Sequence, residues 1–352
     1  MKKLEILFVF SLLLIFLTAC AGIKYLTIET QEPAQVTLPK NVKSVIIVNN
    51  VVQQPNDIGH NILKVGNKEM DRTKASSDSI AIFYAEALSQ FLSEEEYFTS
   101  VMYNKTPLRE DNNFWTEELL SPEQMNELKK KSGADAVISL DKLIMQTDMR
   151  EHFKQEGYSY GNLMAKIQST LRIYLPTMEG KIPSIEYKDS LLWEGYDAHN
   201  RRVPDEIALP SREEAMKKLA IRAAEKMTYT LAPHWIAQDR WYYTLSDSKM
   251  KEGAILAQNM QWQEAANRWE TFYNNEKNNG KKAKAASNIA LAYEMLGDMN
   301  KAHQWISEAY NLFVKSSGKG SLDTKRALLY KNEIERRKDN SNSLNMQMNE
   351  EK

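Results

Sequence analysis

Runs of β-branched residues alternate with helically spaced apolar residues along the first two thirds of the chain. Residues 44–48 form a β-branched run between polar residues, a pattern that predicts a buried strand. Apolar residues then recur at helical spacing over 76–92, which predicts a helix with one buried face. The polar stretch 53–74 is rich in turn formers and is expected to form a loop. Further strands are expected over 98–103, 134–140, 165–175 and 185–196.

Two serine residues mark the expected starts of further helices. Ser121 can cap a helix, and Gln124, three residues later, can close a capping box. Gly133 is expected to end that helix, because glycine tolerates the left-handed backbone conformation that follows many helices. Ser211 and Glu214 repeat the capping-box spacing and open a helix that is expected to run to residue 231.

The order of these elements is strand, helix, strand, helix, strand, hairpin and helix. It predicts an α/β (α+β) domain with a mixed sheet, which we assign to residues 41–235. The passage Gly133-Ala134-Asp135 into a strand resembles the small periplasmic α/β domains of curli-assembly lipoproteins, penicillin-binding-protein activator lipoproteins and the amino-terminal domain of TolB. Those families act as binding or assembly parts, so the resemblance implies a non-enzymatic role.

An aromatic stretch follows this domain at residues 233–243. Aromatic side chains are large hydrophobes with a polar tip, so the stretch is expected to pack at a junction between two domains. The alternative interpretation is a surface on which a ligand stacks.

Aromatic and small residues recur at fixed spacing in the C-terminal third. Tyr293, Gly297, Ala302 and Ala309 stand at offsets 0, 4, 9 and 16. This spacing resembles the tetratricopeptide repeat, in which small residues let two antiparallel helices approach closely. The resemblance implies an all-α array of helical hairpins, which we assign to residues 236–338.

A weaker unit precedes this one. Ala265 lies 37 residues before Ala302, against a family period of about 34. Met260 stands where the family has its turn glycine. The array is expected to offer a concave surface to a peptide or protein partner. The candidate surface residues are Trp262, Trp269, Tyr293 and Trp305, although most of them are expected to pack in the core, as aromatic residues at helical spacing usually do.

The two ends of the chain carry different signals. After Lys2 and Lys3, an apolar run covers residues 6–17, which is shorter than the roughly 20 residues that span a membrane. The run ends in Leu17-Thr18-Ala19-Cys20, which resembles the lipobox of bacterial lipoproteins. At the other end, residues 339–352 are polar and are expected to be disordered.

The lipobox resemblance implies a processed and acylated protein. Residues 1–19 would be a signal peptide removed by cleavage, Cys20 would carry the lipid, and residues 20–40 would form a tether to the membrane. Ala21 follows the cysteine, which in these families fits the outer membrane, with the protein facing the periplasm. An ordinary signal peptide with a chance cysteine, or an uncleaved anchor helix, remains open as an alternative.

Composition removes several classes of function. The chain has 46 basic and 47 acidic residues, so no positive surplus indicates a nucleic-acid partner. Its single cysteine cannot form an internal disulfide. The five histidines form no local metal motif and no phosphate-binding glycine loop is present, so no metal or other cofactor is expected. Ser246 to Lys249 formally match the Ser-x-x-Lys nucleophile motif, but the companion motifs are missing and the segment is expected to start a helix.

Two loose pairs could still contribute to a catalytic site. Asp197 lies two residues before His199, and Asp148 lies before His152. Solvated loop polarity is the simpler interpretation of both pairs. The leading hypothesis is a membrane-anchored, non-enzymatic module for protein interaction or envelope assembly, and the alternative is a periplasmic hydrolase or glycan-processing enzyme. The combined features also resemble a family of lipoproteins from anaerobic Gram-negative gut bacteria that has no assigned activity.

Overall fold

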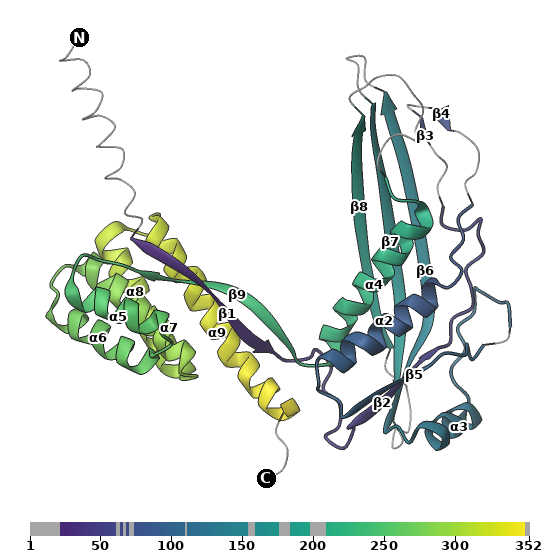
Figure 1. Cartoon of the computed structure of the whole chain (residues 1–352), viewed down its shortest axis with the longest axis horizontal. Coiled ribbons are helices and arrows are strands. Elements are labelled where there is room, and N and C mark those ends of the chain that lie inside the picture. Colours follow the sequence, from purple (N-terminus) through teal and green to yellow (C-terminus); the bar gives the residue numbers. More distant parts are fainter. Residues whose placement is uncertain are drawn as a thin grey trace. The chain divides into compact units, whose positions relative to one another are not determined.

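The computed structural model divides the protein into two compact units (Figure 1). It describes residues 22–60, 64–65, 68–69, 74–109, 111–153, 159–175, 184–197 and 209–348. Of the described residues, unit 1 combines those up to Glu32 with Trp235–Met348, and unit 2 comprises those within Pro33–His234. Unit 2 is therefore an insertion in the sequence of unit 1.

Three parallel strands form the centre of unit 2. β2 (Ser44–Asn49) lies between β5 (Ser100–Asn104) and the first part of β6 (Ala136–Phe153). The side chains of β2 alternate between the two faces of the sheet, as the period of a strand requires. Val45 and Ile47 enter the main core, whereas Ile46 and Val48 enter a smaller cluster on the opposite face. This two-sided burial explains why the strand is a continuous apolar run.

A long antiparallel meander extends the sheet. β7 (Ser159–Tyr174) pairs with β6 on one side and with β8 (Ser184–Asp197) on the other. The register of β6 and β7 shifts between Leu140 and Lys142, which marks a β-bulge. Two short strands, β3 (Lys64–Val65) and β4 (Lys68–Glu69), pair beside the far part of β6.

Helices cover the two faces of this sheet unequally. Figure 1 shows α2 (Ile80–Glu94) and α4 (Arg212–Leu231) packed together on one face, where they close the main core. α3 (Pro122–Ser132) packs on the other face through Leu128, with the smaller cluster. The mixed sheet with helices confirms the predicted fold class of this region.

The expected caps are present. Gln124 N donates to Ser121 Oγ over 3.2 Å, and Ser121 N donates to Gln124 Oε1 over 2.9 Å. Gly133 ends the helix with φ 69°. At the start of α4, Glu214 N donates to Ser211 Oγ over 3.1 Å.

Unit 1 consists of a two-stranded ribbon and a helical array. Consecutive helices pack on one another along the array. The central one, α7, is buried on nearly all sides, which its alanine-rich sequence permits. This arrangement confirms the all-α region, while its assignment to the tetratricopeptide family stays a prediction. The helices are α5 (Ser248–Gln258), α6 (Trp262–Asn275), α7 (Asn279–Met295), α8 (Met299–Ser317) and α9 (Leu322–Met348).

The two predicted turns of the array share a backbone conformation. Gly297, between α7 and α8, has φ 78°, and Met260, between α5 and α6, has φ 59°. A left-handed conformation is unfavourable for methionine, so the turn imposes it. Met260 therefore occupies the glycine position structurally as well as in sequence.

Two expectations about the ends of unit 1 were wrong. Residues 20–40 were expected to be a tether, but residues 23–32 form the strand β1 (Ile23–Glu32), which pairs with β9 (His234–Tyr243). The pattern Ile28, Thr30 and Glu32 is buried at every second position, which is the period of a strand. The tail from 339 was expected to be disordered, but α9 continues to Met348. Within the described residues, no helix is long and apolar enough to cross a membrane.

Candidate functional site

A loop between β5 and α3, residues 105–120, crosses the carboxyl ends of the parallel strands. Leu108 N donates to Asn49 O over 3.0 Å, and Asn50 Nδ2 donates to Glu118 O over 2.8 Å. Both asparagines lie where β2 ends. Ligand sites of open α/β sheets lie outside the carboxyl ends of the strands, so this loop occupies the position where a site is expected.

The loop exposes two large apolar side chains and buries their neighbours. Trp115 is 72% exposed and Leu119 is 53% exposed, whereas Phe114 and Leu120 are only 3% and 5% exposed. The buried pair fixes the loop to the body of unit 2, and the exposed pair faces solvent. The sequence did not single out this pair of adjacent aromatic residues, because the contacts that bury Phe114 come from distant strands such as β6.

Hydrogen bonds from Arg109 to other residues of the loop hold the loop in one conformation. Arg109 donates to both carboxylate oxygens of Asp111 over 2.8 and 2.7 Å and to Thr116 O over 2.8 Å. Asn113 N donates to Asp111 Oδ1 over 2.8 Å. The hydrogen bond from Arg109 is the main reason that the pKa of Asp111 lies below its ordinary value. A planar guanidinium with several bonds fixes the backbone on both sides of Trp115.

A buried carboxylate connects the loop to the sheet. The side chain of Asp141, on β6, is fully buried. It accepts from Ser139 Oγ over 2.5 Å and from Asn50 Nδ2 over 3.2 Å. Arg172, on β7, donates to Asp141 over 2.5 Å and reaches the loop at Glu117 over 2.8 Å. The chain of contacts therefore runs from the core of the sheet to the outer part of the loop.

Burial governs the titration of this network. It raises the pKa of Asp141 above its ordinary value, and the hydrogen bonds from Ser139 and Arg172 oppose that shift. The neighbouring Lys142 has its pKa lowered, chiefly by burial. Its ammonium group donates to Phe114 O and lies 4.3 Å from the centroid of the Phe114 ring. Both oxygens of Asp141 are occupied by internal donors, so the geometry fits a clamp better than a general base.

The structure describes the candidate catalytic pairs only in part. Asp148 binds Arg150 over 2.9 Å, so its charge is already paired. The side chains of His152 and Asp197, and all of His199, lie outside the part that the structure describes. Across the described residues, no three His, Cys, Asp or Glu side chains gather as a metal site would require.

A histidine that the sequence did not single out lies inside unit 2. His60 Nδ1 and Thr147 Oγ1 are 2.8 Å apart, and Arg212 donates to the same hydroxyl over 2.7 Å. The pKa of His60 lies below its ordinary value of 6.5, first because of burial and second because of the Arg212 charge. The imidazole therefore favours its neutral form, and the arrangement makes unit 2 sensitive to acid.

The aromatic surface expected on the helical array is only partly present. Trp269 is fully buried and Trp262 is 9% exposed, so both pack in the core and the prediction was wrong for them. Trp269 is packed against Gly253, where an added Cβ would lie 2.4 Å from its Nε1. Trp305 is half-buried and lines a groove of about 570 Å³ on α8 and α6. Tyr293 is half-buried and donates to Glu270 over 3.0 Å.

The chain's own ribbon occupies one side of the array. Asn288, on α7, accepts from Tyr243 N over 2.7 Å and donates to Tyr243 O over 2.8 Å. A side-chain amide that pairs with both backbone groups of an extended residue is a means of binding peptides. Here it binds β9 of the same chain, so this side of the array holds an internal strand.

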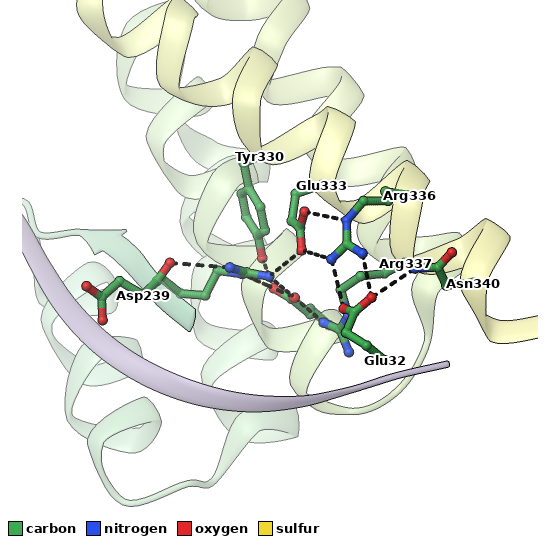
Figure 2. A network of polar contacts seen from close by, with 9 residues as sticks. Glu32, Asp239, Tyr330, Glu333, Arg336, Arg337 and Asn340 are labelled. Carbon is green, nitrogen blue, oxygen red and sulfur yellow. Dashed lines mark hydrogen bonds and ion pairs between the residues drawn. The ribbon is translucent and has the colours of Figure 1, made fainter. Parts of the chain in front are cut away.

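A second buried network fixes the ribbon to the helices (Figure 2). Glu294, on α7, has a fully buried side chain and accepts from Arg240 of β9 over 2.9 to 3.2 Å. It also accepts from Tyr330 over 2.5 Å and from Arg337, both on α9. Burial raises the pKa of Tyr330 well above its ordinary value.

The same network extends to the N-terminal strand. Arg336 of α9 donates to the carboxylate of Glu32 over 2.5 and 2.8 Å and also binds Glu333 over 2.8 Å. Asn340 donates to Glu32 over 2.9 Å. Figure 2 shows these side chains converging between the strand and the helix. The network joins parts of the chain more than 300 residues apart, so we infer that its role is to stabilise the fold of unit 1.

The chain was compared with curated proteins and with solved structures. No curated protein matches the chain. The crystal structure of a neuraminyllactose-binding hemagglutinin homolog from Helicobacter pylori matches with 15% identity over 56% of this chain and 87% of that one. Its TM-score of 0.26 is too low to carry an argument.

The predicted lipid-bearing residue Cys20 lies outside the described residues, so acylation stays a prediction.

Family models cover both units. Residues 251–336 match the model described as a domain of unknown function, DUF6340. Residues 42–243 match another model with the same kind of description, DUF8603, which spans the sheet, the clamped loop and β9. Because this second match covers more than half of the chain, the protein belongs to the DUF8603 family.

Proposed function

We propose that the protein is a lipid-anchored envelope protein that binds a partner protein through the loop 105–120 of unit 2. The observation that supports this proposal most strongly is Trp115, a 72% exposed tryptophan. The backbone of its loop accepts hydrogen bonds from the side chains of Arg109, Asn50 and Lys142. The partner would supply an apolar pocket that receives the indole ring and the adjacent Leu119.

The rigidity of the loop explains why it suits binding. Ordering a flexible loop on association costs free energy, and a loop that is already ordered avoids that cost. Arg109 and Arg172 hold this loop from two sides before any partner arrives. Tryptophan is among the residues that contribute most at protein interfaces, because a single side chain buries a large apolar area.

The chemistry around the loop favours binding over catalysis. The carboxylate of Asp141 is enclosed by Ser139, Asn50 and Arg172, and the ammonium of Lys142 by Phe114. Groups that transfer protons must reach the substrate directly or through one water. The groups with shifted pKa values are used here to hold the loop, so we assign them a structural role within a binding site.

The membrane anchor is the second part of the proposal. The lipobox-like sequence ending in Cys20 supports acylation of that cysteine, and the tether is short because β1 starts at Ile23. In cells grown with labelled fatty acid, the protein is expected to carry the label and to fractionate with membranes. Cys20→Ala should lose both properties, and a labelled Cys20→Ala variant would contradict the assignment.

The binding site is tested by site-specific crosslinking in living cells. A photoreactive amino acid at Leu119 is expected to form one main adduct of higher mass, which mass spectrometry can identify. The same group at Lys188, an exposed residue of β8, serves as the control. The adduct from Leu119 should disappear when Trp115→Ala is added. Identical adducts from both positions would contradict the proposed site.

A further inference from the structure

We propose that unit 1 rests directly on an anionic lipid bilayer, with the end at which β1 and α9 begin as its contact surface. This inference rests on the proposed acylation of Cys20 and adds a surface to it. The partner is a membrane with negatively charged headgroups, and the contact side chains are Lys24, Lys319, Leu322 and Lys325.

The short distance between the lipid and the fold is the first argument. Ile23, the first residue of β1, follows Cys20 by three positions. A fully extended chain spans at most about 3.6 Å per residue, so the start of β1 lies within about 11 Å of the acylated residue. The folded unit therefore begins at the bilayer surface.

Hydrogen bonds place the first turn of α9 beside the start of β1. Thr244 N donates to Gly22 O over 2.8 Å, and Tyr243 Oη donates to Asp323 over 3.1 Å. Gly22 and Asp323 are thus bound to two consecutive residues, the last residue of β9 and the residue that follows it. Ile23 packs against the cluster that contains Tyr243 and Ala327, which gives the same placement.

The side chains at this end suit a membrane interface. Leu322 is 63% exposed at the first position of α9, and Tyr25 of β1 is also 63% exposed. Lys24, Lys319 and Lys325 are exposed as well, while the nearby carboxylate of Asp323 is paired with Arg326 over 3.3 Å. Apolar and aromatic side chains enter the headgroup region, and basic side chains beside them bind anionic lipid.

The opposite end of the same helix provides a matched control. Met346 is 64% exposed, almost the same as Leu322, and lies 24 residues further along α9. With a rise of 1.5 Å per residue the two side chains are about 36 Å apart. Gln31, near the far end of β1, contacts Met348, so this end of α9 lies away from the start of the strand.

The experiment uses the fact that Cys20 is the only cysteine, so acylation leaves no free thiol. Acylated Leu322→Cys and Met346→Cys proteins carry an environment-sensitive fluorophore on the new thiol and are placed in vesicles of phosphatidylethanolamine and phosphatidylglycerol that contain a lipid-bound quencher. The Leu322→Cys probe should be blue-shifted and quenched several-fold more strongly than the Met346→Cys probe.

Charge reversal completes the test. One basic side chain near an anionic surface strengthens membrane binding by about fivefold, so Lys319→Glu with Lys325→Glu should weaken quenching at position 322. Equal quenching at both positions in an acylated protein overturns the contact surface alone. Absence of fatty-acid label on Cys20 overturns the anchor and, with it, this inference. A concentration-dependent blue shift at position 322 without vesicles overturns it in favour of contact between copies of the chain.

Discussion

Within the described residues, each unit contains a carboxylate whose side chain is fully buried, and the two carboxylates serve different purposes. Glu294 in unit 1 accepts from Arg240, Arg337 and Tyr330, all in secondary-structure elements. Asp141 in unit 2 has one arginine partner, Arg172, whose other end binds a surface loop. The partners of Glu294 therefore all lie in helices and strands of unit 1, whereas the network of Asp141 connects the sheet to a surface loop.

This difference separates a structural network from one that shapes a site. Removing the carboxylate of Glu294 should loosen the fold, because the two arginines around it stay buried after losing their shared partner. Removing the charge of Asp141 should loosen the loop alone, because Arg172 can still bind Glu117 or turn to solvent. Variants of the two carboxylates test this distinction, and their effects should decrease in the order that follows.

Glu294→Gln should have the largest effect. It removes the carboxylate that Arg337 and Arg240 share and leaves Arg240 with the longer contact to Glu333, 3.5 Å away. Breaking a buried ion pair on one side costs about 3–5 kcal/mol. Amide hydrogen exchange should therefore accelerate throughout α7 and β9 while unit 2 stays protected. Glu270→Gln, which alters only the half-buried contact with Tyr293, is the control and should change exchange little.

Asp141→Asn should have an intermediate effect that is concentrated in the loop. Hydrogen bonds to a charged group contribute about 1.5–3 kcal/mol, and Glu117 remains to pair with Arg172. Fluorine NMR of fluorotryptophan at Trp115 should show a broadened or shifted signal, while the Trp193 signal serves as the internal control. A Trp115 signal identical to that of the wild type would show that the loop does not depend on Asp141.

Acid should distinguish the units through His60. Its folded-state pKa lies below 6.5, so the unfolded chain binds the proton more readily. The stability of unit 2 is then fully retained above pH 6.5 and decreases as the pH falls from there towards the folded-state value. Urea unfolding followed by exchange in unit 2 should show this slope between pH 7.5 and 5.5, and His60→Asn should flatten it. A slope that survives the substitution would assign the acid sensitivity to another group.

Trp115→Ala should have the smallest effect on stability. Replacing an exposed side chain usually changes the free energy of unfolding by less than about 0.5 kcal/mol, and the Trp115 ring packs edge-on against the neighbouring Phe114 ring at 5.2 Å between centroids. Trp269→Ala should instead cost about 3–5 kcal/mol, because that ring is fully buried. Thermal unfolding of the two variants checks this contrast, and a strong destabilisation by Trp115→Ala would mean that the ring packs against the protein.

Local patterns were sufficient to predict much of unit 2. The capping box at Ser121 and the serine cap at Ser211 lie within three residues of the groups they contact. The β-branched run at β2 carries its strand preference in its own side chains, although its partner strands are distant. Their physics is local, so the chain displays it directly. The same holds for Gly297, whose left-handed turn depends on the residue itself.

Features that depend on distant partners were missed. β1 carries an alternating pattern at Ile28, Thr30 and Glu32, but its partner β9 is about 200 residues away, and the stretch was taken for a tether. Glu294 resembles any acidic residue on a helix until side chains from β9 and α9 enclose it. The exposure of Trp115 likewise follows from contacts with β2, β6 and β7, which no local pattern records.

The central claim is that Trp115 binds a partner while the rest of unit 2 supports it. The most direct test measures how much of the identified crosslinking partner copurifies with full-length protein that carries Trp115→Ala or Trp235→Ala, both tryptophans being more than half exposed. The account predicts that Trp115→Ala loses most of the partner and that Trp235→Ala retains it. Equal recovery from both variants would contradict the account.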